Sequence, residues 1–381
     1  MNVEKLREDF PVLTKDVIYL DSACMALKPR QVVDKMNEYY NEYPACAGRS
    51  NHRFSKRVEQ EVNDSRKTIK KFIGAKSDKE IVFTRNTTES INLLANSFNF
   101  NKVLLTDREH NSNLLPWQKF KKYGILKSNL DLSFSLERFS EIVKNYDLIS
   151  FVATSNVDGY TLPIKEIIKI AHEANAKVHL DAAQLVPHQE VDVKKLDVDF
   201  MSFSGHKMLG PTGTGVFYAK EKLLEGMKQF IVGGETVINT TYQDHVVEKI
   251  PNRFEAGLQD YAGIIGLGSA AKYLGKVGLE EIKDHEIKLV KAVNTEGLKL
   301  IGHRGARGIL NFNVPGVNYH QVAGILDASK NIMIRSGQHC VHSWYNAQNI
   351  EGSARASFYL YNTLEEVKVL NEALENVKKL K

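Results

Sequence analysis

The sequence predicts an α/β fold in which helices cover both faces of a mostly parallel β-sheet. Between residues 80 and 218, short apolar segments alternate with longer segments in which apolar residues recur at helical spacing. The short segments are apolar throughout rather than alternating with polar residues, which is typical of strands buried on both faces. Polar, turn-forming residues follow these segments, as expected where a strand ends and a connection begins.

The elements of this large α/β part can be assigned in chain order. A charged amphipathic helix at Val58–Phe72 precedes the first strand. The expected strands are Glu80–Thr84, Lys102–Thr106, Leu148–Ala153, Lys177–Leu180, Phe200–Phe203 and Gly215–Tyr218. The helices expected between them are Thr88–Phe98, Leu136–Asn145 and Ile164–Ala174.

The pattern changes near residue 261 and predicts a smaller C-terminal α+β domain. Its expected elements are a Gly- and Ala-rich segment at Tyr261–Leu274, helices at Leu279–Gly297, Tyr319–Ala328 and Thr363–Lys379, and strands at Ile309–Val314 and Ile332–Arg335. We therefore expect three parts. Residues 1–18 form an N-terminal segment that packs with the small domain, residues 19–260 form the large domain, and residues 261–381 form the small one.

Composition narrows the class of protein. The chain has 381 residues, 43% of them hydrophobic and 25% charged, which is ordinary for a globular protein. The net charge of +5 is small and the basic residues are scattered, so we expect no nucleic-acid partner. The absence of an 18-residue apolar run, together with a charged N-terminus, predicts a cytoplasmic protein without a membrane partner. Three widely spaced cysteines favour neither a disulfide framework nor a bound metal.

Two of the expected strands end in residues of complementary charge. Asp181 follows Val178-His179-Leu180, and Lys207 ends the polar turn after Phe200–Phe203. A lysine amine can form a Schiff base with the aldehyde of pyridoxal phosphate, and a carboxylate can pair with its protonated ring nitrogen. Taken alone, Lys207 is more simply an ordinary surface lysine at the end of a strand.

Polar groups at the other strand ends favour the cofactor site. Thr87 and Thr88 open a helix, where free N–H groups and hydroxyls suit a phosphate, although a plain N-cap explains them too. His110 could lie against a cofactor ring or simply be solvated. Asn156 and Gln184 follow two further strands and could meet the cofactor's phenolic oxygen. Each signal is weak, but their combination in this order predicts a pyridoxal phosphate site at the carboxyl edge of the sheet.

Over nearly its whole length the chain resembles the class V, fold-type I pyridoxal phosphate enzymes, and within them the SUF-type (group II) cysteine desulfurases and selenocysteine lyases. The segments that carry the resemblance are Phe83-Thr84-Arg85-Asn86-Thr87-Thr88-Glu89-Ser90-Ile91-Asn92, Ser204-Gly205-His206-Lys207, Arg253-Phe254-Glu255-Ala256-Gly257 and Arg335-Ser336-Gly337-Gln338-His339-Cys340. The resemblance implies a large domain plus a small C-terminal domain, a homodimer, and sulfur transfer from L-cysteine to an acceptor protein.

The resemblance also assigns roles to individual residues. It implies that Lys207 is the Schiff-base lysine, that Asp181 is the pyridinium partner, and that His110 stacks on the ring. Further roles follow by position: Gln184 and Asn156 near the ring oxygen, Thr87, Thr88, Ser204 and His206 on the phosphate, Arg355 on the substrate carboxylate, and Asn156 and Ala23 beside the substrate.

Cys340 identifies the reaction that we expect. The resemblance makes it the sulfur acceptor, and it lies fifteen residues before Arg355, as in these desulfurases. Independently, removing sulfur from cysteine needs a nucleophile that can attack the substrate's sulfur, which a thiolate does. His339, His342 and Arg335 lie close in sequence and could lower the thiol pKa or carry protons. A purely structural cysteine is the alternative.

Some residues depart from the pattern of this family. Leu258 stands where a threonine normally reaches the partner subunit's phosphate, and Thr154 replaces a histidine. The roles of Cys24 and Cys46 stay open between packing and chemistry.

The predicted activity is the conversion of L-cysteine to L-alanine with a persulfide on Cys340, which supplies sulfur for iron–sulfur cluster or thio-cofactor synthesis. The alternatives are a selenocysteine lyase, an aminotransferase, an epimerase, and a sulfur carrier with a vestigial cofactor site.

Overall fold

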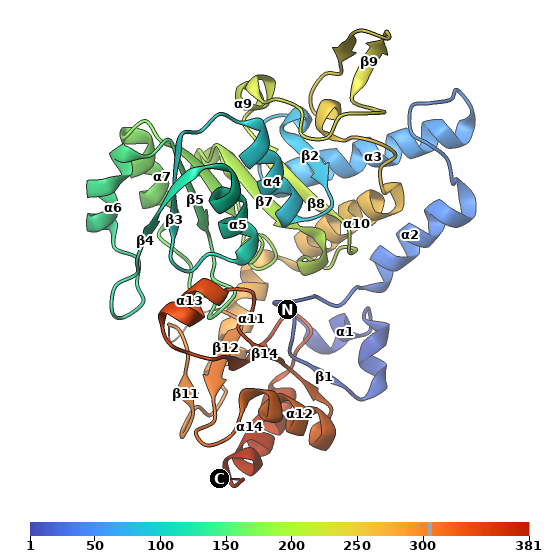
Figure 1. Ribbon diagram of the computed structural model, residues 1–381. Coiled ribbons are helices and arrows are strands. Elements are labelled where there is room, and N and C mark those ends of the chain that lie inside the picture. Colours follow the sequence, from blue (N-terminus) through green and yellow to red (C-terminus); the bar gives the residue numbers. More distant parts are fainter. Residues whose placement is uncertain (304–306, 381) are drawn as a thin grey trace.

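The computed structural model describes residues 1–303 and 307–380, and it confirms an α/β architecture around a seven-stranded sheet (Figure 1). The strand order is β2-β8-β7-β6-β5-β3-β4. Only β8 runs antiparallel to its neighbours, and the other pairs are parallel. The strands are β2 (Ile81–Thr84), β3 (Lys102–Thr106), β4 (Lys122–Leu126), β5 (Leu148–Val152), β6 (Lys177–Asp181), β7 (Phe200–Ser204) and β8 (Gly215–Ala219).

Side chains of β2, β3, β5, β7 and β8 enter two different cores, which explains the continuous apolar pattern of these strands. In β7, for example, Met201 and Phe203 join one core, whereas Phe200 joins the core on the opposite face. Helices α2 (Arg30–Glu42), α3 (Arg53–Phe72), α6 (Leu136–Ile142), α7 (Ile164–Glu173), α8 (Val193–Leu196) and α10 (Tyr261–Val277) contribute to the first core. Helices α4 (Thr87–Ser97), α5 (Asn111–Phe120) and α9 (Glu221–Gly226) contribute to the second.

A second, antiparallel sheet of four strands lies in the C-terminal part, in the order β11-β12-β15-β14. The N-terminal segment reaches it through α1 (Val3–Arg7) and β1 (Ile18–Tyr19), which pairs with β13 (Ile332–Met333). The other elements here are β11 (Lys299–Leu300), β12 (Ile309–Asn313), β14 (Arg335–Gly337), β15 (Ser353–Ser357), α11 (Leu279–Lys291), α12 (Tyr319–Lys330), α13 (His342–Ala347) and α14 (Leu364–Lys378). Helix α10, which the sequence assigned to the small domain, packs against α2 and α3 of the large domain. The predicted domain boundaries at residues 18 and 260 stay predictions.

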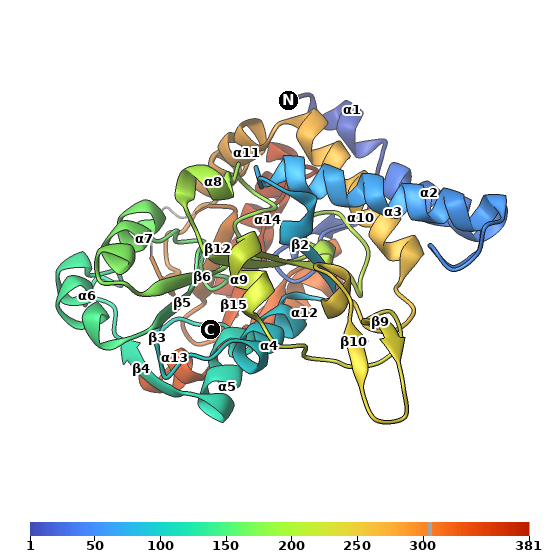
Figure 2. The ribbon, with the colours of Figure 1, turned by 90° about the horizontal axis from the view of Figure 1, so that it is seen from above.

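Some elements had no clear signal in the sequence. A hairpin of β9 (Val237–Thr240) and β10 (His245–Val247) projects from the large domain, and nearly all its residues are exposed (Figure 2). Strand β4 lies at the sheet edge, where Tyr123 and Ile125 stay exposed. Because neither element buries a full face, neither shows the hydrophobic periodicity that identifies a buried strand.

Candidate active site

The structure brings the predicted residues together around a cavity of about 250 Å³ at the carboxyl ends of the central strands. Every predicted site residue borders this cavity except Cys340 and Arg355. The bordering residues are Ala23, Thr87, Thr88, His110, Asn156, Asp181, Gln184, Ser204, His206 and Lys207. Ligands of open α/β sheets bind at this edge, because the parallel strands all end there.

Lys207 and Asp181 occupy the ends of the neighbouring strands β7 and β6. Burial lowers the pKa of the Lys207 amine, and the charge of Asp181 partly opposes this shift. Asp181 is buried and accepts a hydrogen bond from the Ala183 N–H at 3.1 Å, while burial raises the pKa of its carboxyl group. The buried Lys207 amine and the buried Asp181 carboxyl group thus border the same cavity.

The start of α4 forms a polar corner of the cavity. The Thr87 N–H donates to the Ser204 hydroxyl at 2.9 Å, and the two hydroxyl groups lie 2.7 Å apart. The Thr88 hydroxyl lies 2.7 Å from that of Ser112. Gly205 lies beside this corner, and a Cβ there would come within 2.2 Å of the Thr214 hydroxyl oxygen. N–H groups at a helix start together with converging hydroxyls suit a phosphate.

His110, Asn156 and Gln184 form the remaining polar wall. Burial lowers the pKa of His110 to about 3, and its Nδ1 accepts the Ser112 N–H at 3.1 Å, so the ring is neutral with its proton on Nε2. The Gln184 Nε2 donates to the Ala23 carbonyl at 2.6 Å. Within the described residues, the buried Asn156 Oδ1 and Gln184 Oε1 have no hydrogen-bond partner.

These features fit pyridoxal phosphate. The unpartnered amide oxygens are buried polar atoms that a ligand or solvent would satisfy, since buried polar atoms are normally bonded. Lys207 would hold the cofactor covalently, Asp181 would face its ring nitrogen, and the start of α4 with Ser204 would hold its phosphate. Burial lowers the pKa of His206 to about 4, so this residue would contribute as a neutral group.

Cys340 lies beside Arg335 at the edge of this site. The Arg335 guanidinium donates to the Cys340 Sγ at 3.3 Å and itself borders the cavity. The Cys340 carbonyl accepts the Asn111 N–H at 2.8 Å, which ties its loop to the start of α5. The half-buried thiol therefore lies next to a fixed positive charge, a setting typical of reactive cysteines.

Neither histidine near Cys340 forms a hydrogen bond with the thiol among the described contacts. Their suggested part in proton transfer stays a prediction. His339 is buried, its Nε2 lies 3.1 Å from the Ser353 hydroxyl, and burial lowers its pKa to about 2. A neutral histidine gives no positive charge to the sulfur. His342 is exposed and pairs with the Asn111 side chain at 2.8 Å. Arg335 alone of the three suggested groups forms a hydrogen bond with the sulfur among the described contacts.

Arg355 is fully buried in β15 and does not border the cavity. Its guanidinium donates to the Asn156 carbonyl at 2.8 Å and to the Asp21 carboxylate at 3.2 Å. Its predicted role as the clamp for the substrate carboxylate stays a prediction. As found, Arg355 supports Asn156 from behind, and Arg335 is the arginine that lines the cavity.

Two further residues line the cavity: Cys24, whose role the sequence left open between packing and chemistry, and Ser112, to which the sequence assigned no role. Cys24 lies in the N-terminal segment Asp21-Ser22-Ala23-Cys24, and its position next to a recognisable segment was the only signal available. Ser112 fixes the His110 ring and contacts Thr88, but nothing in its sequence context indicated this. Cys46 is exposed, as is Leu258, whose side chain is 69% accessible.

Comparison with known proteins identifies the family. The Aminotransferase class-V family matches residues 18–370. The chain belongs to this family. Relatives of the chain include a probable cysteine desulfurase of Pyrococcus abyssi, 40% identical over 99% of this chain and 98% of its own length, and a cysteine desulfurase of Enterobacter, 37% identical over 98% of both chains.

Solved structures of cysteine desulfurases resemble the chain over its whole length. The apo structure of a cysteine desulfurase from Thermococcus onnurineus covers the whole chain with a TM-score of 0.95 and 38% identity, and 99% of that protein is matched. The cysteine desulfurase CsdA of Escherichia coli, solved in an S-sulfonic acid form, matches with a TM-score of 0.92 and 30% identity over 100% of this chain and 99% of its own. This chain therefore has the fold-type I architecture of the class-V family, and pyridoxal phosphate is its cofactor.

Among residues 1–303 and 307–380, no group of three or more His, Cys, Asp or Glu side chains is placed to hold a metal ion. None of the described helices is long and apolar enough to cross a membrane.

Proposed function

We propose that this protein is a cysteine desulfurase that converts L-cysteine to L-alanine and keeps the sulfur as a persulfide on Cys340. The observation that carries the proposal is the contact between Cys340 and Arg335, because Arg335 also borders the cavity of Lys207. A thiol thus lies at the edge of a pyridoxal phosphate site. An aminotransferase or an epimerase has no use for such a thiol.

The residues of the cavity divide the work on the amino acid. Pyridoxal phosphate, when bound, supplies the electron sink that makes the α-proton of the substrate acidic. Lys207 Nζ takes up and returns that proton, which a buried amine with a lowered pKa can do near neutral pH. Asp181 keeps a proton on the ring nitrogen of the cofactor. His110 presents its Nε2–H to the cavity and can donate a hydrogen bond there.

Sulfur transfer then takes place at Cys340. Its thiolate attacks the substrate sulfur, a sulfur–sulfur bond forms and the carbon–sulfur bond breaks, so that the electron pair of that bond stays with carbon. A proton on this carbon completes L-alanine. Arg335 stabilises negative charge on the Cys340 sulfur before the attack and on the persulfide after it.

Several expectations about the surroundings of this chemistry belong to the same proposal. The persulfide would pass to a sulfur-acceptor protein, and from there to iron–sulfur clusters or thio-cofactors. The protein would act as a cytoplasmic homodimer. Relatives named as cysteine desulfurases over their full length support the reaction itself.

Mass spectrometry of Cys340 tests the proposal directly. The protein, loaded with pyridoxal phosphate, is incubated with L-cysteine without added thiol, alkylated and digested. We expect one added sulfur on the Cys340 peptide and alanine in equal amount. The Cys340→Ser variant serves as the matched control and should produce neither. Alanine formation without sulfur on Cys340 would contradict the assignment of the acceptor.

A further inference from the structure

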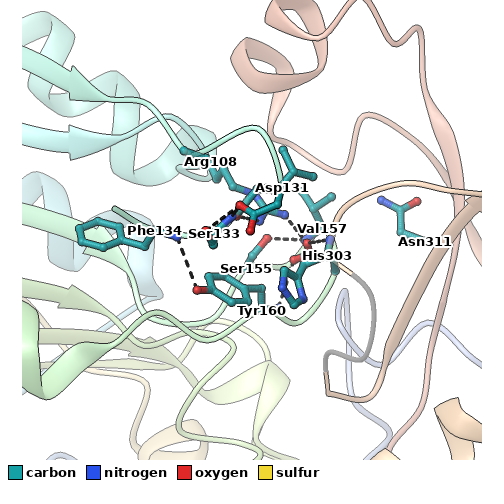
Figure 3. A network of polar contacts seen from close by, with 12 residues as sticks. Arg108, Asp131, Ser133, Phe134, Ser155, Val157, Tyr160, His303 and Asn311 are labelled. Atoms are coloured by element: carbon teal, nitrogen blue, oxygen red, sulfur yellow. Dashed lines mark hydrogen bonds and ion pairs between the residues drawn. The ribbon is translucent and has the colours of Figure 1, made fainter. Parts of the chain in front are cut away.

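A buried ion pair joins the two large-domain loops that border the cysteine loop. Arg108 lies two residues before His110, and Asp158 lies two residues after Asn156. The Arg108 guanidinium contacts the Asp158 carboxylate, and both residues are 3% exposed. The polar contacts around this ion pair are shown in Figure 3, where Arg108 lies close to Val157, Tyr160 and His303. The pair therefore links the loop of His110 to the loop of Asn156.

Asp158 also holds the backbone of the small domain. Its carboxylate accepts the His303 N–H and, at 3.1 Å, the Tyr160 N–H. Gly302, with φ +98°, allows this approach, because a Cβ there would come within 2.6 Å of the Asp158 side chain. One carboxylate thus fixes the loop of Arg108, its own loop and the backbone at His303.

Arg108 faces the helix that follows Cys340. Its guanidinium carbon lies 5.4 Å from the ring centroid of Trp344 in α13, within the range of a cation–π contact. Trp344 and its neighbour Tyr345 form a small apolar cluster with Val157, Val341 and Ile301. Val157 lies between Asn156 and Asp158, so the apolar contacts and the ion pair join the same segments.

The same two loops hold the backbone of the cysteine loop. The Asn111 N–H donates to the Cys340 carbonyl at 2.8 Å, and the Asn156 Nδ2 donates to the His339 carbonyl at 2.7 Å. His339 and Cys340 adopt φ values of +50° and +61°. Two consecutive non-glycine residues in the left-handed region are costly, and such a conformation persists only where the surroundings impose it.

We propose that Arg108 and Asp158 are positioning residues, whose ion pair fixes the Cys340 loop against the loops of His110 and Asn156. Neither side chain borders the cavity, so neither touches substrate or cofactor. They act through the two backbone hydrogen bonds and through Trp344. The catalytic part of this inference rests on the proposed sulfur transfer, but the structural part does not.

The structural part is tested on the resting protein, loaded with cofactor, by alkylating Cys340 with iodoacetamide. The test variants are Asp158→Asn, which keeps oxygen and loses charge, and Arg108→Gln. We expect the Cys340 peptide to be alkylated about tenfold faster, because loss of the buried ion pair lets the loop open more often and exposes the half-buried thiol. Hydrogen exchange should also rise in residues 338–347, while the visible absorption of the bound cofactor stays unchanged. Unchanged alkylation and exchange at Cys340 would overturn the proposal.

Asp199→Asn is the matched control. Asp199 is also a buried carboxylate, in an ion pair with Lys220 and in contact with the His172 ring, but it lies at the opposite end of β7 from Lys207. This variant loses the same charge, so a general loss of stability would appear in it too. If Asp199→Asn accelerates Cys340 alkylation as strongly, the ion pair of Arg108 is only a structural contact and the proposal fails.

The catalytic part is tested by a single turnover with L-cysteine. In the Arg108→Gln and Asp158→Asn variants we expect persulfide formation to slow about tenfold, with the cysteine concentration for half-maximal rate unchanged because neither Arg108 nor Asp158 lines the cavity. Arg108→Lys keeps the charge and should recover part of the rate. Equal loss in Arg108→Lys and Arg108→Gln would contradict a role for the charge. If the variants are alkylated faster but neither they nor the wild type forms a persulfide, the proposed desulfurase activity is wrong and the positioning role of the ion pair still holds.

Discussion

Arg335 donates a hydrogen bond to Cys340 at 3.3 Å, and the two residues stand at opposite ends of a single short segment. Arg335 begins β14, which pairs with β15, and Cys340 lies in the tight turn that follows β14. Because β15 is fully buried, its pairing with β14 holds the backbone of Arg335 in place. The turn brings the Cys340 thiol back toward the Arg335 guanidinium. The nucleophile and its charge partner are thus held by the small sheet.

Arg335→Gln should make Cys340 less reactive. A hydrogen bond to a charged group is worth about 1.5–3 kcal/mol, so we expect alkylation of the Cys340 peptide by iodoacetamide at pH 7 to slow roughly tenfold. Arg335→Lys keeps the charge but loses the planar guanidinium group, so its alkylation rate should lie between those of the wild type and Arg335→Gln. An unchanged rate in Arg335→Gln would show that the contact does not activate the thiol.

Much of the cofactor site could be predicted from the sequence, for a simple physical reason. Parallel strands end at one edge of a sheet, so Asp181 and Lys207 had to lie near each other once β6 and β7 were recognised. Thr87, His110 and Asn156 follow other strands of that sheet by the same logic. The strand pattern was strong because all these strands are buried on both faces.

The environment of Cys340 could not be predicted in the same way. Its position depends on left-handed φ values in two consecutive residues and on contacts with Asn111 and Asn156, far away in sequence. Sequence proximity suggested His339 as a partner of the thiol, but packing turned its ring toward Ser353. The Arg108–Asp158 pair was equally hidden, because a charged residue in a loop is normally exposed.

Lys207→Ala should abolish covalent attachment of the cofactor. We expect the purified wild type, after addition of pyridoxal phosphate, to be yellow with a band near ~420 nm, and the variant to lack that band. Lys220→Ala is the control, because Lys220 pairs with Asp199 at the far end of the sheet. A colourless wild-type protein would contradict the cofactor site as a whole.

Cys340→Ala should separate cofactor binding from sulfur chemistry. Because Cys340 does not border the cavity, the variant should stay yellow. It should lose sulfide release from L-cysteine in the presence of a reductant, measured by methylene blue formation. Cys24→Ala, which removes a thiol that does border the cavity, should keep most of the release. The reverse result, with loss only in Cys24→Ala, would make Cys24 the sulfur acceptor.

The homodimer stays a prediction that light scattering can check. Leu258 is 69% exposed, and the neighbouring Ile231 and Val232 are also exposed, which leaves apolar surface beside the projecting hairpin. Association would bury this surface. We expect a mass of twice the 43.0 kDa chain, reduced toward 43.0 kDa in Leu258→Asp. A wild-type monomer at micromolar concentration would contradict the prediction.

His179 should make the protein sensitive to acid. It is buried between Ser150 and Ser202, at 2.8 and 2.9 Å, and burial lowers its pKa from 6.5 to about 3. Between these values the unfolded chain binds a proton that the folded protein does not, so the stability present above pH 6.5 is lost as the pH falls. At pH 5 this loss is about 2 kcal/mol relative to pH 7.

The His179→Gln variant tests this effect, because glutamine can still bond to one serine but does not titrate. Its free energy of unfolding by guanidinium chloride should be lower than that of the wild type at pH 7, because one hydrogen bond is lost. Between pH 7 and pH 5 it should fall by about 2 kcal/mol less than the wild type. His245→Gln, which replaces an exposed histidine in the hairpin, should keep the wild-type pH dependence. Parallel pH curves for the wild type and His179→Gln would show that His179 is not held neutral by burial.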